Sequence, residues 1–190
     1  MKVLFLNRVY PPADGATGHL LKELAERLAL RGLEITVVTS ATTAEAVVDF
    51  PSASRSTVRI ERVKSLPFSR SSVVQRALSY LSLYPALLWR ALRLPKQDVI
   101  ITMTDPPLLL LVGWFIKLLR GGRLIHWAQD LYPELAEELG VLSKNGLIAK
   151  ICRTVSSFAL RRQQKVISLV RCMNERLLNR GVGEHNIHII

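Results

Sequence analysis

The first forty residues have the pattern of a strand, a Gly/Pro loop, an amphipathic helix and a second strand. The apolar run at residues 3–6 predicts a short buried strand, and the prolines of the loop 8–18 keep that loop from being helical. Leucines and alanines then recur at helical spacing over 20–29, and Gly32 ends the helix before a strand predicted over 33–39. A strand–loop–helix unit of this kind is typical of the first part of a parallel sheet. Its backbone N–H groups point toward the space above the loop, a position that favours phosphate or another anion.

Strand and helix patterns continue to alternate along the chain. Further strands are predicted over 58–63, 98–102, 124–128 and 166–170, with another beginning at 187. Helices are predicted over 73–94, over a segment that Asp105-Pro106-Pro107 starts and Gly121-Gly122 ends, and over 134–139, 145–162 and 174–180. Residues 40–56 read as a loop. Ser71 and Ser72 are candidate caps for the helix 73–94, which Pro85 is expected to kink or split.

Apolar strands joined by crossover helices predict an α/β fold with a Rossmann-like, doubly wound, mainly parallel sheet. The length of 190 residues suits one domain or one lobe of a larger protein. Ligands of such sheets lie beyond the carboxyl ends of the strands. That rule selects the loops 8–18, 103–107, 128–134 and 170–173.

The composition limits the partners and the location of the chain. The net charge is +11, concentrated in 51–100 and 151–190, which favours anionic partners such as nucleic acid, an anionic membrane or phosphorylated substrates. Cys152 and Cys172 have no metal-ligand spacing, which suits a reducing cytoplasm and argues against zinc. The longest apolar stretch, 108–116, is far below the roughly 20 residues that span a bilayer, and no secretory signal is visible.

The loop 8–18 has two interpretations. Gly15 and Gly18 allow backbone to approach a ligand, and Ala16, Thr17 and His19 lie at the start of the helix that follows. The alternative is a tight turn with no ligand and a histidine that faces solvent. Neither G-x-G-x-x-G nor G-x-x-x-x-G-K-[ST] is present, so a nicotinamide dinucleotide or P-loop site is disfavoured.

Acidic and aromatic residues follow the strand predicted over 124–128. Asp130 and Glu134, with Tyr132 between them and Gln129 before them, could bind sugar hydroxyls or hold a reacting hydroxyl. The alternative is that Asp130 caps the next helix and Glu134 favours its first turn. After the strand 98–102, Asp105 reads more readily as a helix cap than as a catalytic group.

Two further residue patterns have competing interpretations. His126 falls inside a strand and is expected to be a core histidine rather than a base. The helix 73–94 combines tyrosines and a tryptophan with arginines, which fits an anionic membrane surface or, equally, packing on the sheet with the arginines outward. No nucleic-acid-binding signature is present, and nucleic acid is not an expected partner.

Taken together, several segments resemble the N-terminal domain of a family-4 GT-B glycosyltransferase. The resemblance covers essentially the whole chain and is closest to the bacterial branch that includes N-acetyl-L-fucosaminyltransferases of surface-polysaccharide assembly. No single motif is specific, but their order and spacing are. The segments are Leu4-Phe5-Leu6-Asn7, Tyr10-Pro11-Pro12, Ala16-Thr17-Gly18, Thr104-Asp105-Pro106-Pro107, Gln129-Asp130-Leu131-Tyr132-Pro133-Glu134, Glu175-Arg176-Leu177-Leu178, Arg180-Gly181-Val182 and Ile187-His188-Ile189-Ile190.

The resemblance implies a function for each part of the chain. Residues 1–190 would be one acceptor-binding lobe, and a second, missing lobe would bind most of the nucleotide-sugar. The loop matching 14–18 would lie near the donor diphosphate. The loop matching 128–134, with Asp130 as the catalytic candidate, would lie near the transferred sugar and the acceptor. The reaction would be retaining and would need no metal or cofactor.

The resemblance also implies the biological setting. The acceptor would be a glycan or a polyprenyl-diphosphate-linked glycan of polysaccharide or lipopolysaccharide assembly. The chain would be cytoplasmic and peripheral on the inner face of the plasma membrane. Without donor-binding groups, the chain alone is expected to transfer no sugar at an enzyme-like rate.

The sequence departs from the family pattern at three positions. Ala16 stands where many members have Gly, Gln129 where many have His, and Val170-Arg171 where Ser-Glu is common. Arg171 could attract an anion, but a carboxylate role at that position is lost. Two other functions remain open: a nucleotide-sugar epimerase, which shares the layout, and a non-catalytic lobe that binds a phosphorylated ligand or a partner domain.

Overall fold

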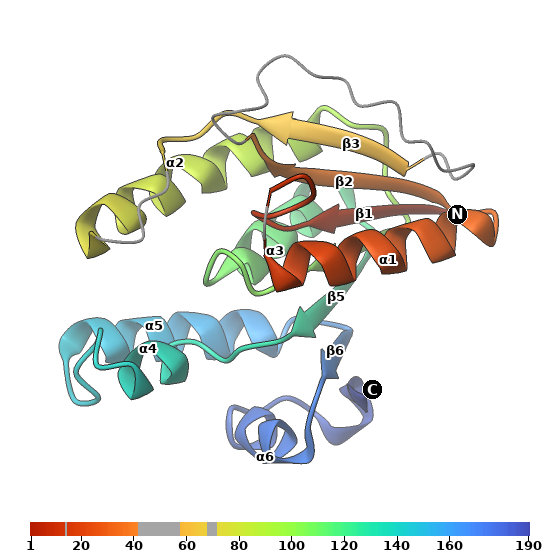
Figure 1. The fold of residues 1–190 in the computed structure, drawn as a ribbon. Coiled ribbons are helices and arrows are strands. Elements are labelled where there is room, and N and C mark those ends of the chain that lie inside the picture. Colours follow the sequence, from red (N-terminus) through yellow and green to blue (C-terminus); the bar gives the residue numbers. More distant parts are fainter. Residues whose placement is uncertain (14, 42–57, 68–71) are drawn as a thin grey trace.

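The computed structural model describes residues 1–13, 15–41, 58–67 and 72–190. Within these ranges the chain forms one seven-stranded parallel sheet with the strand order β3-β2-β1-β4-β5-β6-β7 (Figure 1). The α/β, doubly wound fold predicted from the sequence is confirmed. The strands are β1 (Lys2–Leu6), β2 (Glu34–Ser40), β3 (Val58–Val63), β4 (Val99–Thr102), β5 (Arg123–Ala128), β6 (Lys165–Ser168) and β7 (Ile187–Ile189).

Helices cover both faces of the sheet, as crossover connections require. They are α1 (Ala16–Leu30), α2 (Val73–Leu92), α3 (Leu109–Arg120), α4 (Glu134–Glu138), α5 (Leu147–Leu160) and α6 (Arg171–Asn179), with a 3-10 turn at Glu184–Asn186. Every helix predicted from the sequence is present. In Figure 1, α1 crosses in front of the strands and α3 lies behind them.

Alternation along β1 explains how the core divides between the two faces. Val3 and Phe5 pack with Leu21 of α1, whereas Leu4 and Leu6 pack in a separate cluster with α2 and α3. Both faces of this central strand are buried, so its sequence is a continuous apolar run.

The helix α3 packs unusually close to the sheet. A Cβ on Gly113 would lie 2.5 Å from Thr102 Cγ2 and 2.9 Å from Leu124 Cδ1, so only glycine fits there. This contact fixes α3 against β4 and β5. It therefore also fixes the loop 103–108, which joins β4 to α3.

The helix α2 differs from its prediction at Pro85. The helix is one continuous element from Val73 to Leu92, so the expected split does not occur. Leu83 and Leu87, on either side of the proline, are fully buried in the same core cluster, and this packing holds the two halves together.

Ser72 caps the helix α2 by accepting a hydrogen bond from the Gln75 amide at 3.3 Å. The predicted loop 40–56 from residue 42 on, and the alternative cap Ser71, lie outside the described residues.

Candidate functional site

The strand order reverses direction between β1 and β4, which places a switch point between these two strands. The loops that leave the two strands are joined there by Arg8 and Asp105. The Arg8 guanidinium donates to both carboxylate oxygens of Asp105, at 2.8 Å and 2.7 Å, and the Arg8 amide donates to the Asp105 carbonyl at 2.7 Å. Three hydrogen bonds between two residues thus hold the two loops together.

The structure contradicts the capping role expected for Asp105. The N-cap of α3 is Leu108, which adopts a left-handed conformation with φ 61° and forms no side-chain cap. The two prolines therefore precede the helix instead of occupying its first turn. Asp105 lies before both prolines and pairs with Arg8.

Asp130 and Tyr132 follow β5, next to the loop that carries Asp105. Pro133 is the N-cap of α4 and no side chain caps that helix, so the alternative that Asp130 is a cap is wrong. Burial, with a smaller contribution from the negative charge of Asp105, raises the pKa of the Asp130 carboxyl. Burial, with contributions from Tyr80 and Asp130, raises the pKa of Tyr132 to about 12.

Helix α2 supplies another wall of the same region. The Tyr84 hydroxyl donates to the Pro107 carbonyl in the loop after β4. The negative charge of Asp105 contributes to a raised pKa of Tyr80, after the larger effect of burial. The carboxyl edge of β4 and β5 is therefore lined by two carboxylates and by tyrosines from α2 and from the loop after β5.

A narrow cavity of about 10 Å³ opens beside Asp130. That volume is about what one water molecule needs. Its lining residues are Thr104, Leu108, Leu110, His126, Asp130, Leu131, Tyr132, Ser156 and Leu160.

His126 is a core histidine, as the sequence predicted. It is 3 % exposed, and its Nδ1 lies 3.0 Å from Thr102 Oγ1 and 3.1 Å from the Thr102 carbonyl. Burial lowers the pKa of His126 to about 4, so the ring is neutral at pH 7.

Unsatisfied polar atoms gather at this same edge of the sheet. Among the described residues, buried side-chain atoms of four residues that follow or end β1, β4 and β5 have no hydrogen-bond partner. They are Asn7 Oδ1, Thr104 Oγ1, Trp127 Nε1 and both amide atoms of Gln129. Gln97 and Gln163, which precede β4 and β6, also have an unpaired amide oxygen each, so unpaired groups are not confined to this edge. Native proteins leave few such groups unpaired, and those at the carboxyl edge are candidates for contact with a polar ligand.

The structure gives Gly15 and Gly18 a packing role. A Cβ on Gly15 would lie 2.9 Å from Val9 Cγ1, and one on Gly18 would lie 3.0 Å from that atom and 3.1 Å from the Val9 carbonyl oxygen. Gly15 is the N-cap of α1, and no side chain caps this helix. The two glycines therefore bring the loop 8–13 against the first turn of α1.

The remaining predicted residues are more dispersed. Ala16 and His19 are exposed on α1, and Thr17 Oγ1 lies 3.4 Å from Asn7 Nδ2. Arg171 begins α6, after β6, with an exposed side chain, and in the described part it forms no hydrogen bond with another predicted site residue. The structure brings Asp105, Asp130 and Tyr132 together and leaves Arg171 apart.

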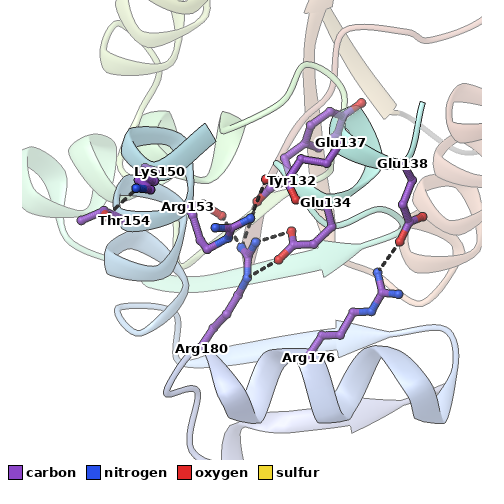
Figure 2. Close-up of polar contacts among 10 residues, drawn as sticks. Tyr132, Glu134, Glu137, Glu138, Lys150, Arg153, Thr154, Arg176 and Arg180 are labelled. Carbon is purple, nitrogen blue, oxygen red and sulfur yellow. Dashed lines mark hydrogen bonds and ion pairs between the residues drawn. The ribbon is translucent and has the colours of Figure 1, made fainter. Parts of the chain in front are cut away.

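Glu134 is engaged by an arginine that sequence reasoning missed. Arg180, with a side chain 6 % exposed, pairs with both carboxylate oxygens of Glu134 (Figure 2). Its Nη1 also donates to the Tyr132 carbonyl at 2.9 Å and to Ser156 Oγ at 2.8 Å. Arg180 therefore fixes the position of the segment that carries Asp130 and Tyr132. An arginine at the end of a short surface helix gives no sequence signal for this role.

Two more ion pairs fix α4 to its neighbours. Glu137 pairs with Arg153 of α5, and Glu138 pairs with Arg176 of α6 at 3.0 Å (Figure 2). The described residues contain no group of three or more His, Cys, Asp or Glu that could hold a metal ion. No helix in the described part of the chain is long and apolar enough to cross a bilayer.

Comparison with known proteins assigns the chain to a family. Residues 15–190 match the model of the glycosyl transferase 4-like domain. The chain belongs to this family. A search of the curated proteins found no match. The match includes the loops after β4, β5 and β6 and begins at the end of the loop after β1, so residues 7–14 lie outside it.

Solved structures place this glycosyl transferase 4-like domain among GT-B lobes. Sucrose-phosphate synthase from Thermosynechococcus elongatus is 16 % identical with a TM-score of 0.69, and the alignment covers 100 % of this chain and 47 % of that chain. A UGT transferase from Siraitia grosvenorii in complex with UDP is 11 % identical with a TM-score of 0.58, over 94 % of this chain and 47 % of that one.

UGT89C1 from Arabidopsis thaliana, complexed with UDP, is 14 % identical with a TM-score of 0.58, over 100 % of this chain and 52 % of that one. The glycosyl transferase 4-like domain thus spans about half the length of these three structures. At these identities the comparison establishes the fold, which is a Rossmann-like lobe of the GT-B type.

Proposed function

We propose that this chain is the acceptor-binding lobe of a glycosyltransferase, and that the acceptor lies at the carboxyl edge of β4 and β5. The observation that carries the proposal is the set of unpaired polar atoms in the segments around Asp130: Thr104 Oγ1 lines the same cavity as Asp130, and both amide atoms of Gln129 belong to the preceding residue. Amide and hydroxyl groups are suited to sugar hydroxyls, which both donate and accept hydrogen bonds.

Asp130 is the proposed catalytic residue. Its carboxylate would accept a hydrogen bond from the reacting acceptor hydroxyl and orient it toward the donor sugar. Partial burial makes the Asp130 charge costly, which favours a hydroxyl donor that compensates it. Gln129 and Tyr132 would contact the same sugar, and Asp105 would act through its pairing with Arg8 and its effect on the pKa of Asp130.

The donor would be a nucleotide-sugar whose diphosphate lies near the first turn of α1. The uncapped start of that helix at Gly15 carries partial positive charge, and no acidic residue stands in its first turn. Two of the similar structures are complexes with UDP. We propose that a second lobe supplies most of the donor contacts, and that transfer retains the anomeric configuration without a metal.

The order of the motifs supports a finer placement, in the bacterial N-acetyl-L-fucosaminyltransferase-like branch. In that setting the acceptor would be a glycan or a polyprenyl-diphosphate-linked glycan of surface-polysaccharide or lipopolysaccharide assembly. The chain would then work in the cytoplasm, against the inner face of the plasma membrane.

Calorimetric titration tests the proposal with two water-soluble probes, a farnesyl-diphosphate-linked N-acetylglucosamine and UDP. We expect the acceptor probe to bind and Asp130→Asn to weaken binding about tenfold or more, the loss of one charge-assisted hydrogen bond. Glu138→Gln, on the exposed side of α4, is the matched control and should bind as the unaltered chain does.

Two outcomes would contradict the proposal. The first is equal binding of the acceptor probe by the Asp130→Asn and Glu138→Gln variants. The second is tight binding of UDP with no binding of the acceptor probe. Turnover of a radiolabelled donor by the chain alone would contradict the need for a second lobe.

A further inference from the structure

Three of the helices on the face of the sheet opposite α1 contain no acidic residue, whereas α6, which packs in the same core cluster as α3 and α5, contains Glu175. Within α2, α3 and α5 there is no Asp or Glu, whereas they carry Arg76, Arg90, Lys117, Arg120, Lys150 and Arg153. Arg90 pairs with Glu61 of β3 and Arg153 with Glu137 of α4, whereas α1 pairs its lysine and arginine with glutamates of its own, four residues away. The outer surfaces of α2, α3 and α5 therefore carry basic side chains and no acidic side chain of their own.

Helix α2 exposes an apolar stripe along its outer side. Val74, Leu78, Leu81 and Trp89 are 68 %, 49 %, 63 % and 60 % exposed. Their spacing, together with that of Pro85, puts them on one side of the helix, opposite the buried Leu83 and Leu87. A helix that is apolar on its outer side as well as its inner side has a second apolar environment to contact.

The stripe has counterparts on the neighbouring helices. On α3, Phe115, Leu118 and Leu119 are 43 %, 64 % and 61 % exposed. On α5, Leu147 and Ile148 are 73 % and 64 % exposed. Helix α3 packs against both α2 and α5, so these residues belong to one layer of helices. We call the exposed apolar residues of this layer the α2–α3–α5 face.

We propose that the α2–α3–α5 face docks on an anionic lipid bilayer. Leucine, valine and phenylalanine side chains would enter the interface between headgroups and acyl chains, and Lys117 of α3 and Lys150 of α5 would meet anionic headgroups. Arg93 stacks over Trp89 with its guanidinium carbon 4.4 Å from the ring centroid, so cation and aromatic ring would enter the headgroup layer together. The absence of acidic side chains from these three helices favours an anionic surface over a neutral one.

This inference deepens the proposed function and rests on it for the identity of the acceptor. Helix α2 carries the apolar stripe and also contributes Tyr80 and Tyr84 to the wall of the acceptor site. A bilayer against α2 would therefore lie beside the loops after β4 and β5. An acceptor anchored by a polyprenyl chain would reach Asp130 without leaving the membrane.

Vesicle flotation tests the docking in the absence of any acceptor or nucleotide-sugar. The probes are vesicles of phosphatidylcholine alone and vesicles with about a third phosphatidylglycerol, at low and high salt. We expect the chain to float with the anionic vesicles at low salt, to stay in solution with the neutral ones, and to be released by salt. The Leu78→Gln/Leu81→Gln variant should reduce the bound fraction about tenfold or more.

The matched control is Leu20→Gln/Leu30→Gln, which removes exposed leucines from α1 on the opposite face. It should bind vesicles as the unaltered chain does. Fluorescence of Trp89 gives a second measurement, because its emission should shift to shorter wavelength on docking and Trp89→Phe should abolish that shift.

Three results would overturn the docking proposal. They are equal flotation with neutral and anionic vesicles, loss of binding in the α1 variant instead of the α2 variant, and no flotation. If the face instead joined two copies of the chain, light scattering would show a dimer that Leu78→Gln/Leu81→Gln dissociates. Since the soluble acceptor probe needs no vesicle, failure of docking is distinguishable from failure of acceptor binding.

Discussion

Arg8 and Asp105 form a two-pronged ion pair across the switch point of the sheet, with both guanidinium contacts at 2.8 Å or less. Each side chain is about one-fifth exposed, so the pair is partly screened from water. The pair joins the loop after β1 to the loop after β4. It thereby places a negative charge near Asp130, the residue on which the proposed chemistry depends.

The first prediction concerns the charge of Asp105. Asp105→Asn should lower the pKa of Asp130, because the negative charge of Asp105 is one of the two causes of its raised value. Carbon-13 NMR of labelled aspartate carboxyls measures this, with Asp130→Asn to assign the signal. Asp98→Asn, which alters a carboxylate that binds the Lys2 amide at the start of β1, is the control and should leave the pKa of Asp130 unchanged. An unchanged pKa in Asp105→Asn would show that the two carboxylates do not interact.

The second prediction concerns Arg180. Arg180→Ala leaves Glu134 without its partner in a largely buried setting, so the free energy of unfolding should fall by about 3–5 kcal/mol. Arg176→Ala breaks the Glu138 pair, in which both side chains are about half exposed, and should cost about 0–1 kcal/mol. Urea denaturation measures both. Similar costs for the two variants would mean that Arg180 does not hold the segment after β5.

The third prediction concerns pH. His126 has a folded-state pKa of about 4 against an ordinary value of 6.5. Between these values the unfolded chain binds a proton that the folded chain excludes, so stability should fall as the pH is lowered through this window. At pH 5 the loss relative to pH 7.5 should be about 2 kcal/mol.

His126→Gln provides the control for this pH effect. The variant should lack this part of the pH dependence, while contributions from carboxylates remain in both proteins. Urea denaturation at pH 7.5 and pH 5 measures the difference between the two. Parallel pH profiles for the variant and the unaltered chain would contradict a buried neutral histidine.

The fourth prediction separates two glycines that share one neighbour. Gly15→Ala and Gly18→Ala should each destabilise the fold by about 1–3 kcal/mol, because the added methyl meets Val9. Removing the Val9 side chain should rescue Gly15→Ala, whose close contacts are all with that side chain. It should not rescue Gly18→Ala, which also approaches the Val9 carbonyl at 3.1 Å. Thermal denaturation of the two glycine variants, each with and without Val9→Ala, decides this, and equal rescue of both would contradict the packing described.

The sequence predicts the fold well because hydrophobic periodicity is a local signal. The buried run at 3–6 and the alternation over 58–63 place β1 and β3 directly. Gly32, with φ 84°, ends α1 where expected. Pro85 shows the limit of local rules, because tertiary packing on both sides of it keeps α2 continuous.

The candidate site is less predictable because its contacts are distant in sequence. The local pattern made Asp105 and Asp130 look like helix caps, but Asp105 pairs with a residue 97 positions away and Asp130 caps no helix. Arg180 acts 46 residues from Glu134. Such partners follow from strand order, which the sequence indicates only as a class of topology.

The most direct test of an acceptor at the carboxyl edge of β4 and β5 is hydrogen exchange with and without the farnesyl-diphosphate-linked N-acetylglucosamine probe. Mass spectrometry of peptic fragments reports where amides slow down. We expect slowing confined to the segments 103–108 and 129–134, and its loss in Asp130→Asn. Slowing only at the opposite edge, where β1, β2 and β3 begin, would contradict the proposed site.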